Sequence, residues 1–424
     1  MLTPGSDVRI EIEKPAAGGR MIARHEGQIV LVAGAIPGEH VSARIERVEK
    51  RLAFASTTSV LKASPDRRAA RDPLCGGCVY AHIAYARQVS LKADIISDAF
   101  TRIGRIPLQQ SVNVLPSPEA GYRLRARLHV NEGGAGFYRE GTHTLCDARL
   151  TNQLSPGAMD AVDAALAALG DARSAVTSIE LSENISSDQR ALHFDITREA
   201  QSIESQLGRV IEAAGLSGCT ARGYLGPLLR VGQPTVTDPL STLTSGRAAS
   251  GQLGRQPASF FQGNRFLVPQ LVTTVLDATP SNTIVLDLYA GVGLFSLALA
   301  STGQTRVTAV EGDKSSSSDL RENAAPYGDA IKVKVGRVED FIHCTPERAA
   351  TIVVDPPRTG MSREAMDAIA SHGASRIVYV SCDPPTMARD ARRLLDADYR
   401  LTSLQGFDLF PNTPHVESVG VFDR

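Results

Sequence analysis

The amino-acid sequence predicts an α/β protein whose C-terminal part forms a doubly wound, largely parallel sheet. Short strands separated by Gly and Pro fill residues 1–60, and mixed strands and helices continue to about residue 250. From about residue 258, strand, glycine loop and helix alternate. We therefore expect an all-β barrel at 1–60, a central α+β domain at 61–250 and a doubly wound domain at 251–424.

The bulk composition is that of an ordinary globular protein. The chain has 424 residues, 42% of them hydrophobic, and a net charge of -1, which excludes a uniformly basic nucleic-acid binder. There is no apolar run of bilayer length, and the N-terminus has no apolar segment typical of a secretion signal. The six cysteines are scattered, so we expect no disulfide framework and a cytoplasmic location.

The N-terminal elements follow from alternation and turn residues. Val8, Ile10 and Ile12 alternate with polar residues, and this pattern gives a strand one apolar face. Four such runs are DVRIEIEK, GQIVLVAG, EHVSARIERVEK and LAFASTTSVL. A linker at 63–73 and a helix from about 85 to 104 come next, and this helix can pack on the C-terminal domain. A segment rich in Ser, Gly and Thr at 241–259 marks the second boundary.

The run TIVLDLYAGVGLFSLALAST reads as a buried strand, a tight loop and the start of a helix. Gly291 and Gly293 allow a ligand to approach the loop backbone closely. Ser296 stands where the dinucleotide fingerprint has its third glycine, so a bound pyrophosphate is the weaker interpretation. Glu311 ends the next strand, where a carboxylate can accept both hydroxyls of a ribose. These residues favour a nucleoside cofactor and leave S-adenosylmethionine and NAD open.

Two further strands end in reactive side chains. Cys382 follows the apolar run 377–380, and Asp355 ends the preceding strand TIVVD. In a parallel sheet both lie at the edge that carries the glycine loop, where ligands bind. On residue pattern alone, Cys382 is either a nucleophile or a small buried apolar residue, and Asp355 is either functional or a turn starter. The last segment, FDLFPNTPHVESVGVFDR, resembles a returning strand pair and contains Glu417, which on residue pattern alone is more often a surface residue.

Taken together, five motifs resemble the RNA 5-methyluridine methyltransferases, which methylate carbon 5 of uridine in transfer or ribosomal RNA. They are FFQGNRF, DLYAGVGLFSLALA, DPPRTG, SCDPPTMARD and HVESVGVF, in the order and spacing of that family. The resemblance covers most of the chain. It implies a Rossmann-like class I methyltransferase fold, an OB-like TRAM barrel at 1–60 and S-adenosyl-L-methionine as cofactor.

The same resemblance assigns roles to individual residues. It implies that Cys382 is the nucleophile, Glu417 the general base and Asp355 a contact of both substrate and cofactor. The positions that match cofactor-binding residues are Gln262, Tyr289, Glu311 and Asp355. The sequence departs from the family at Asp383 and Pro385, where many members have Asn and Ala.

Three rival functions are weaker. Amino-group methyltransferases follow Asp-Pro-Pro with an aromatic residue that stacks the base, whereas this chain has Arg358, and they need no cysteine. A non-catalytic RNA-binding protein on an inactive methyltransferase fold would not need both Cys382 and Glu417. A NAD enzyme is disfavoured by the missing third glycine.

Basic residues gather near the middle of the chain. Residues 61–130 contain eleven Lys and Arg against five Asp and Glu. Arg123, Arg125 and Arg127 alternate with Leu124 and Ala126, so on a strand they share one face, which either lines up with phosphates or is simply solvated. We expect an RNA partner, tRNA or rRNA, no DNA or membrane partner, and a monomer.

Cys75, Cys78 and Cys146 match three of the four ligands that the family uses for an iron–sulfur cluster. The fourth position is occupied by Ala69. A four-thiolate cluster normally needs four cysteines, so a bound cluster and a loop with reduced thiols are both open.

Overall fold

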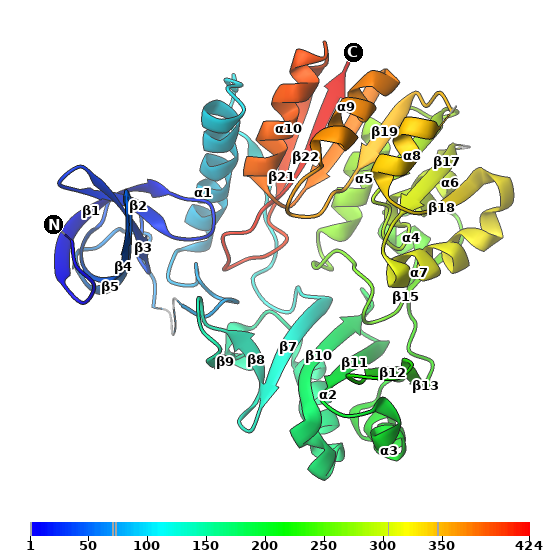
Figure 1. Cartoon of the computed structure of the whole chain (residues 1–424), viewed down its shortest axis with the longest axis horizontal. Coiled ribbons are helices and arrows are strands. Elements are labelled where there is room, and N and C mark those ends of the chain that lie inside the picture. The colour runs from blue at the N-terminus through cyan, green and yellow to red at the C-terminus, as the bar shows by residue number, and fades with distance from the viewer. Residues whose placement is uncertain (1, 70–71, 73, 304, 346) are drawn as a thin grey trace.

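The computed structural model describes residues 2–69, 72, 74–303, 305–345 and 347–424. Figure 1 shows the N-terminal barrel on one side, the central sheet below and the C-terminal sheet with its helices above. The predicted α/β class is confirmed. Within the described parts of the chain, every helix is too short or too polar to cross a lipid bilayer.

The N-terminal barrel is closed and has the strand order β1-β2-β3-β5-β4. Its strands are β1 (Asp7–Pro15), β2 (Met21–His25), β3 (Gln28–Ala33), β4 (His40–Glu49) and β5 (Leu52–Lys62). The alternating residues of β1 point inward, as predicted, and are buried. The sequence indicated four strands and missed β2, because five residues after a Gly-rich turn carry little periodicity.

The central sheet has the order β13-β12-β11-β10-β7-β8-β9. These strands are β7 (Arg125–Asn131), β8 (Gly134–Tyr138), β9 (Leu145–Asp147), β10 (Val176–Glu183), β11 (Arg190–Ile196), β12 (Gly218–Arg222) and β13 (Leu229–Gly232). Helices α2 (Pro156–Ala168) and α3 (Glu204–Ala214) cover one face. The Ser- and Gly-rich segment near 241–259 holds α4 (Leu240–Leu243) and β15 (Gln252–Arg255), which pairs with β14 (Val236–Pro239).

The C-terminal sheet has the order β18-β17-β16-β19-β20-β22-β21-β6. Its core strands β16 (Ile284–Leu288), β17 (Arg306–Glu311), β18 (Ile331–Val335), β19 (Thr351–Val354) and β20 (Arg376–Ser381) are parallel. One face is covered by α5 (Val268–Ala278), α6 (Leu294–Gly303) and α7 (Lys314–Ala324), and the other by α8 (Val338–Cys344), α9 (Arg363–His372) and α10 (Pro384–Asp396). The strand order reverses between β16 and β19, which is where such folds bind ligands.

Two elements from early in the chain complete this domain. Helix α1 (Tyr85–Asp98) and a π-helical turn (Ala99–Ile103) pack beside α10 in the same apolar core (Figure 1). Strand β6 (Asn113–Leu115) extends the C-terminal sheet by pairing with β21 (Arg400–Phe407). Residues before 250 are therefore built into the sheet that the sequence assigned to 251–424.

The last strand pair differs from its prediction. Strand β22 (Glu417–Asp423) does return antiparallel, between β20 and β21. Its partner β21 ends at Phe407, so residues 408–416 form a loop where the sequence suggested a first strand. The two prolines in this loop remove backbone donors that a strand would need.

Candidate active site

The predicted site residues meet at one edge of the C-terminal sheet. Tyr289 and Asp355 each follow the last residue of neighbouring strands, since Leu288 pairs with Val354. Cys382 follows β20 one strand further along. The structure therefore brings three of the predicted residues to the carboxyl edge beside the strand-order reversal.

The glycine loop between β16 and α6 has the tight geometry that was predicted. Gly291 and Gly293 have φ angles of 57° and 96°, and Tyr289, at 63°, is also left-handed. A Cβ atom at Gly293 would lie 2.8 Å from Leu297 and from Leu320. The loop must therefore keep a glycine at this position.

Glu311 ties the end of β17 to this loop. Its carboxylate accepts hydrogen bonds from the backbone N–H of Gly291 at 2.8 Å and of Asp313 at 2.6 Å. Burial raises the pKa of Glu311 despite these donors. The carboxylate is thus held at the loop, where it can accept hydroxyl donors from a ligand.

Gln262 reaches the same edge from the segment before α5. Its side-chain amide donates to a carboxylate oxygen of Asp355 at 3.1 Å. Burial, together with the nearby carboxyl of Asp287, raises the pKa of Asp355 to about 7, and the Gln262 hydrogen bond opposes the rise. Asp355 is therefore poised to change charge near neutral pH.

Ser296 has a specific role at the position where a dinucleotide fingerprint would have glycine. Its hydroxyl donates to the carboxylate of Asp287, which is completely buried on β16. Burial raises the pKa of Asp287 to about 7. The serine therefore supports a buried carboxyl beneath the loop.

The thiol of Cys382 is half-buried among charged side chains. Burial raises its pKa to about 12, the neighbouring Glu417 adds to this rise, and a hydrogen bond and the charge of Arg358 oppose it. Glu417 is only 3% exposed, and burial followed by the charge of Asp355 raises its pKa well above the ordinary value. Four side chains, those of Cys382, Glu417, Asp355 and Arg358, thus influence one another at this edge.

The sequence did not identify Arg358 as a site residue. Its only signal in the sequence is its place three residues after Asp355, where amino-group methyltransferases have an aromatic residue. The arginine lowers the pKa of both the thiol and the Glu417 carboxyl. It is the cation that opposes the effect of burial on both groups.

His415 lies near the same arginine. Its ring meets that of Phe410 edge-on, with the centroids 6.2 Å apart. Burial, followed by the positive charges of Arg358, Lys92 and Arg123, lowers the pKa of His415 to about 4. The imidazole is therefore neutral at physiological pH.

Comparisons with known proteins identify the family. A family model described as tRNA (Uracil-5-)-methyltransferase matches residues 329–424, and a TRAM domain model matches residues 2–58. The 23S rRNA (uracil(1939)-C(5))-methyltransferase RlmD of Methylococcus capsulatus is 31% identical, covering 99% of this chain and 98% of the relative. The enzyme of the same name from Alkalilimnicola ehrlichii is 32% identical, with 99% and 97% covered. The chain belongs to the RNA uracil-C5 methyltransferase family.

This membership confirms the predicted family and enzyme class. The fold agrees as well: the crystal structure of Pyrococcus abyssi tRNA (uracil-54, C5)-methyltransferase in complex with S-adenosyl-L-homocysteine superimposes with a TM-score of 0.76. The match covers 97% of this chain and 99% of that one, at 23% identity. The predicted TRAM barrel and methyltransferase domain are therefore both present.

The arginine stripe of this uracil-C5 methyltransferase lies on β7 and just before it. The side chains of Arg123, Arg125 and Arg127 share one face, because the intervening Leu124 and Ala126 are buried. Arg125 pairs with Glu180 and Arg127 with Asp195, while Arg123 donates to Gln153 and to a backbone carbonyl. Since each arginine already has a partner in the protein, phosphate binding along this stripe stays a prediction.

The cysteines do not fit the four-thiolate cluster that the family resemblance implied, and two of the three are not reduced thiols either. Cys75 and Cys146 form a disulfide, and Cys78 is a free, half-buried thiol that donates to the carbonyl of Asp72 at 3.3 Å. Ala69 occupies the fourth position. Within the described ranges, no group of three or more His, Cys, Asp or Glu side chains is arranged to hold a metal ion.

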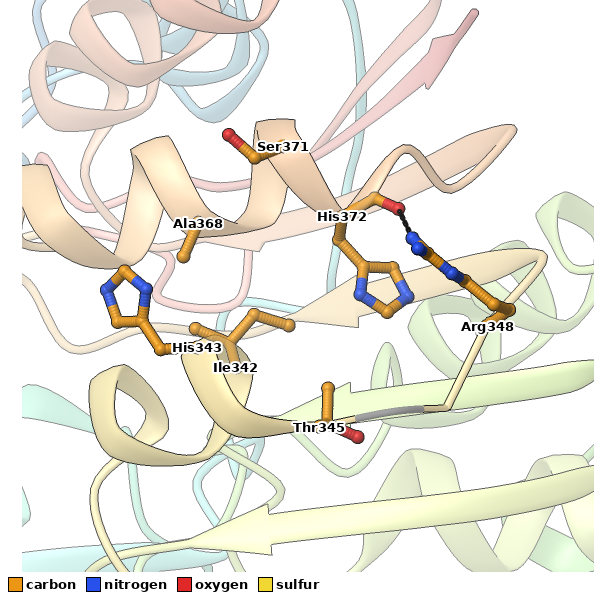
Figure 2. Close-up of a pocket in the computed structure, with 7 residues that line it drawn as sticks. All are labelled: Ile342, His343, Thr345, Arg348, Ala368, Ser371 and His372. Atoms are coloured by element: carbon orange, nitrogen blue, oxygen red, sulfur yellow. Dashed lines mark hydrogen bonds between the residues drawn. The ribbon is translucent and has the colours of Figure 1, made fainter.

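A separate hollow lies at the opposite edge of the sheet. It has a volume of about 220 Å³ and lies between the C-terminal ends of α8 and α9 (Figure 2). Arg348 donates to the carbonyl of His372 across it. Because β19 begins on this side and ends at Val354, directly before Asp355, the hollow is not part of the active site.

Proposed function

We propose that this protein transfers a methyl group from S-adenosyl-L-methionine to carbon 5 of a uridine in RNA, through a covalent adduct with Cys382. The observation that carries the proposal is the shared location of Cys382, Glu417 and Arg358 beside Asp355 and the glycine loop. The two relatives at 31% and 32% identity are named as 23S rRNA enzymes, so 23S rRNA is the first substrate to test. A cytoplasmic location and a monomeric state also stay predictions.

The residues at the edge fit the proposed cofactor. The loop at Gly291 and Gly293 admits close approach of a nucleoside, and Glu311 offers a carboxylate to ribose hydroxyls. Tyr289, Gln262 and Asp355 would complete the binding residues. The sulfonium of the bound cofactor supplies an activated methyl group, and the negative charge of Asp355 would favour a cation there.

The protein's own residues would drive the chemistry on the base. The Cys382 thiolate adds to carbon 6 of uracil, and the displaced electron pair makes carbon 5 a nucleophile. Carbon 5 would then take the methyl group, and the electron pair of the broken sulfur–methyl bond would stay on the cofactor's sulfur, which becomes a neutral thioether. Glu417 removes the proton from carbon 5, the carbon 6–sulfur bond breaks, and the thiolate leaves. Asp355 would accept from the ring N–H.

Thiolate formation is the step for which Arg358 is suited. With a pKa of about 12, the thiol of the free protein is protonated at neutral pH. Arg358 favours the negative charge on sulfur, and a bound uridine would displace water around both groups. We infer that deprotonation is coupled to substrate binding.

The test uses three variants with labelled S-adenosyl-L-methionine and a 23S rRNA fragment. Glu417→Gln should trap a methylated RNA–protein adduct that survives denaturing electrophoresis. Cys382→Ala should bind the cofactor normally but form no product and no adduct, and the double variant should lose the adduct of Glu417→Gln. Substantial product from Cys382→Ala would overturn the assignment of the nucleophile. Near wild-type turnover by Glu417→Gln would overturn that of the base.

A further inference from the structure

The loop that leads into Glu417 is held by residues far away in the sequence. This loop, residues 408–416, connects β21 to β22. Asp408, at its start, forms an ion pair with Lys92 of α1, and both side chains are completely buried. Lys92 also donates to the carbonyl of Phe410 at 3.0 Å. The ion pair and this hydrogen bond join the start of the loop to α1.

The centre of the loop is held by hydrogen bonds to Asn412. The residue has a left-handed φ of 64°, and its side-chain oxygen accepts from Gln88 at 2.9 Å and from Arg68 at 2.8 Å. Its backbone N–H donates to Gln88 at 2.8 Å, and its carbonyl accepts from Tyr80 at 2.8 Å. Gln88 is thus bound to both the backbone and the side chain of Asn412.

The remaining loop residues touch three other parts of the chain. Tyr122 donates to the carbonyl of Pro411 at 3.2 Å, and Asn264 donates to that of Leu409 at 3.1 Å. Pro414 packs on Gly19 of the barrel, where an added Cβ would lie 2.9 Å from the proline ring. The barrel, α1 and the segment before α5 therefore converge on nine residues.

Hydrogen bonds within the loop also join its residues. The hydroxyl of Thr413 donates to the carbonyl of Phe410 at 2.7 Å and accepts from the backbone N–H of His415 at 3.3 Å. Pairing of β22 with β20 and β21 already fixes the backbone of Glu417. What the loop adds is the placement of the residues directly before the carboxylate, including His415.

We propose that Gln88 and Asn412 are positioning residues for the proton-removal step, so that docking of α1 on the loop sets the carboxylate of Glu417. This inference rests on the proposed role of Glu417 as the base. The alternative is that the contacts only stabilise the packing of α1. The positioning role predicts that removing the contacts slows proton removal from carbon 5. The packing role predicts a loss of stability without a specific effect on that step.

The experiment replaces Gln88 by Met, which keeps the length of the side chain but removes its hydrogen bonds. We expect kcat to fall about tenfold, since a buried hydrogen-bonded pair is lost, with KM changed less than about threefold. The labelled, methylated RNA–protein adduct should accumulate, as in Glu417→Gln. Leu91→Ala is the matched control, because Leu91 is a buried α1 residue whose cluster is the barrel core.

Asn412→Gly gives a second, independent variant, because glycine tolerates the left-handed backbone and only the side chain is lost. Adduct accumulation in either variant, but not in Leu91→Ala at a matched loss of Tm, supports the inference. Unchanged kcat, or a lower kcat without adduct, in variants that are folded and bind the cofactor overturns it. Failure of Glu417→Gln itself to trap adduct would count against the proposed function instead.

Discussion

Glu417 stands next to Cys382 across the antiparallel pair β20 and β22, just beyond the paired residues Ser381 and Ser418. The carboxyl group is among the causes that raise the pKa of the thiol, second to burial, while Arg358 opposes the rise. The proposed base and nucleophile are thus electrostatically coupled before any substrate binds. This coupling can be measured on the free protein.

The first prediction is that Glu417→Gln makes Cys382 more reactive. A neutral amide no longer disfavours the thiolate, so the pKa of the thiol falls and alkylation by iodoacetamide at pH 9 should accelerate about three- to tenfold. In the wild type, the rate should still be rising at pH 10, because the pKa is about 12. Mass spectrometry of the Cys382 peptide follows the reaction.

Cys344, which is exposed, provides an internal control and should react equally in both proteins. Arg358→Met should act in the opposite direction and slow the alkylation of Cys382, because it removes the cation that favours the thiolate. Equal rates in all three proteins would show that the charges do not act on the thiol.

The second prediction concerns the charge of Asp355, whose pKa is about 7. A sulfonium bound nearby favours the ionised carboxylate, so the affinity for S-adenosyl-L-methionine should rise from pH 6 to pH 8 and level off above. Asp355→Asn should abolish this pH dependence. Calorimetric titration at four pH values measures it.

S-adenosyl-L-homocysteine is the matched ligand control, because its sulfur is neutral. Its affinity should depend less on pH in the same range. A flat pH profile for S-adenosyl-L-methionine in the wild type would place its sulfonium away from Asp355.

The sequence predicted those features that depend on local pattern. Alternation in residues such as Val8, Ile10 and Ile12 predicted barrel strands, and repeated strand–loop–helix units predicted the parallel sheet. The glycine loop and the carboxyl-edge positions of Asp355 and Cys382 follow from the same logic. These signals are local because side-chain periodicity reflects one buried face of one element.

The rest depends on contacts between distant segments. β6 has only three residues and is a strand because β21 lies beside it. The meeting of Cys382 and Glu417 requires β22 to insert antiparallel beside β20, which no periodicity indicates, and only the family resemblance linked the two residues. The contacts of Gln88 with Asn412 also join segments that have no pattern in common.

The third prediction concerns stability and Asp287. Its folded pKa of about 7 lies above the value of 3.8 for an unperturbed carboxyl, so folding takes up a proton between these limits. The stabilising effect of that proton is fully present below pH 3.8 and is lost as pH rises through about 7. Asp287 should therefore lower the free energy of unfolding by about 1.4 kcal/mol per pH unit across this window.

Urea denaturation of the cofactor-free protein at pH 5, 6, 7 and 8 measures the free energy of unfolding. This free energy should fall with rising pH less steeply in Asp287→Asn than in the wild type. Ser296→Ala is the matched control with the opposite sign: it removes the donor that lowers the pKa of Asp287, so its decline should continue above pH 7. If the free energy of unfolding changed with pH equally in the three proteins, Asp287 would be ionised over the whole range from pH 5 to pH 8.

The last prediction concerns the cysteine loop. Protein purified without oxygen should contain no stoichiometric iron or sulfide, because Ala69 supplies no thiolate and Cys75 is paired with Cys146. In oxidised protein, Cys146→Ala should lower the free energy of unfolding by roughly 2–4 kcal/mol, as expected for loss of a disulfide. Reducing the wild type should cause the same loss, while the variant should not respond to reductant. A brown anaerobic preparation with iron and sulfide, lost in Cys78→Ser, would show instead that the three thiolates hold a cluster.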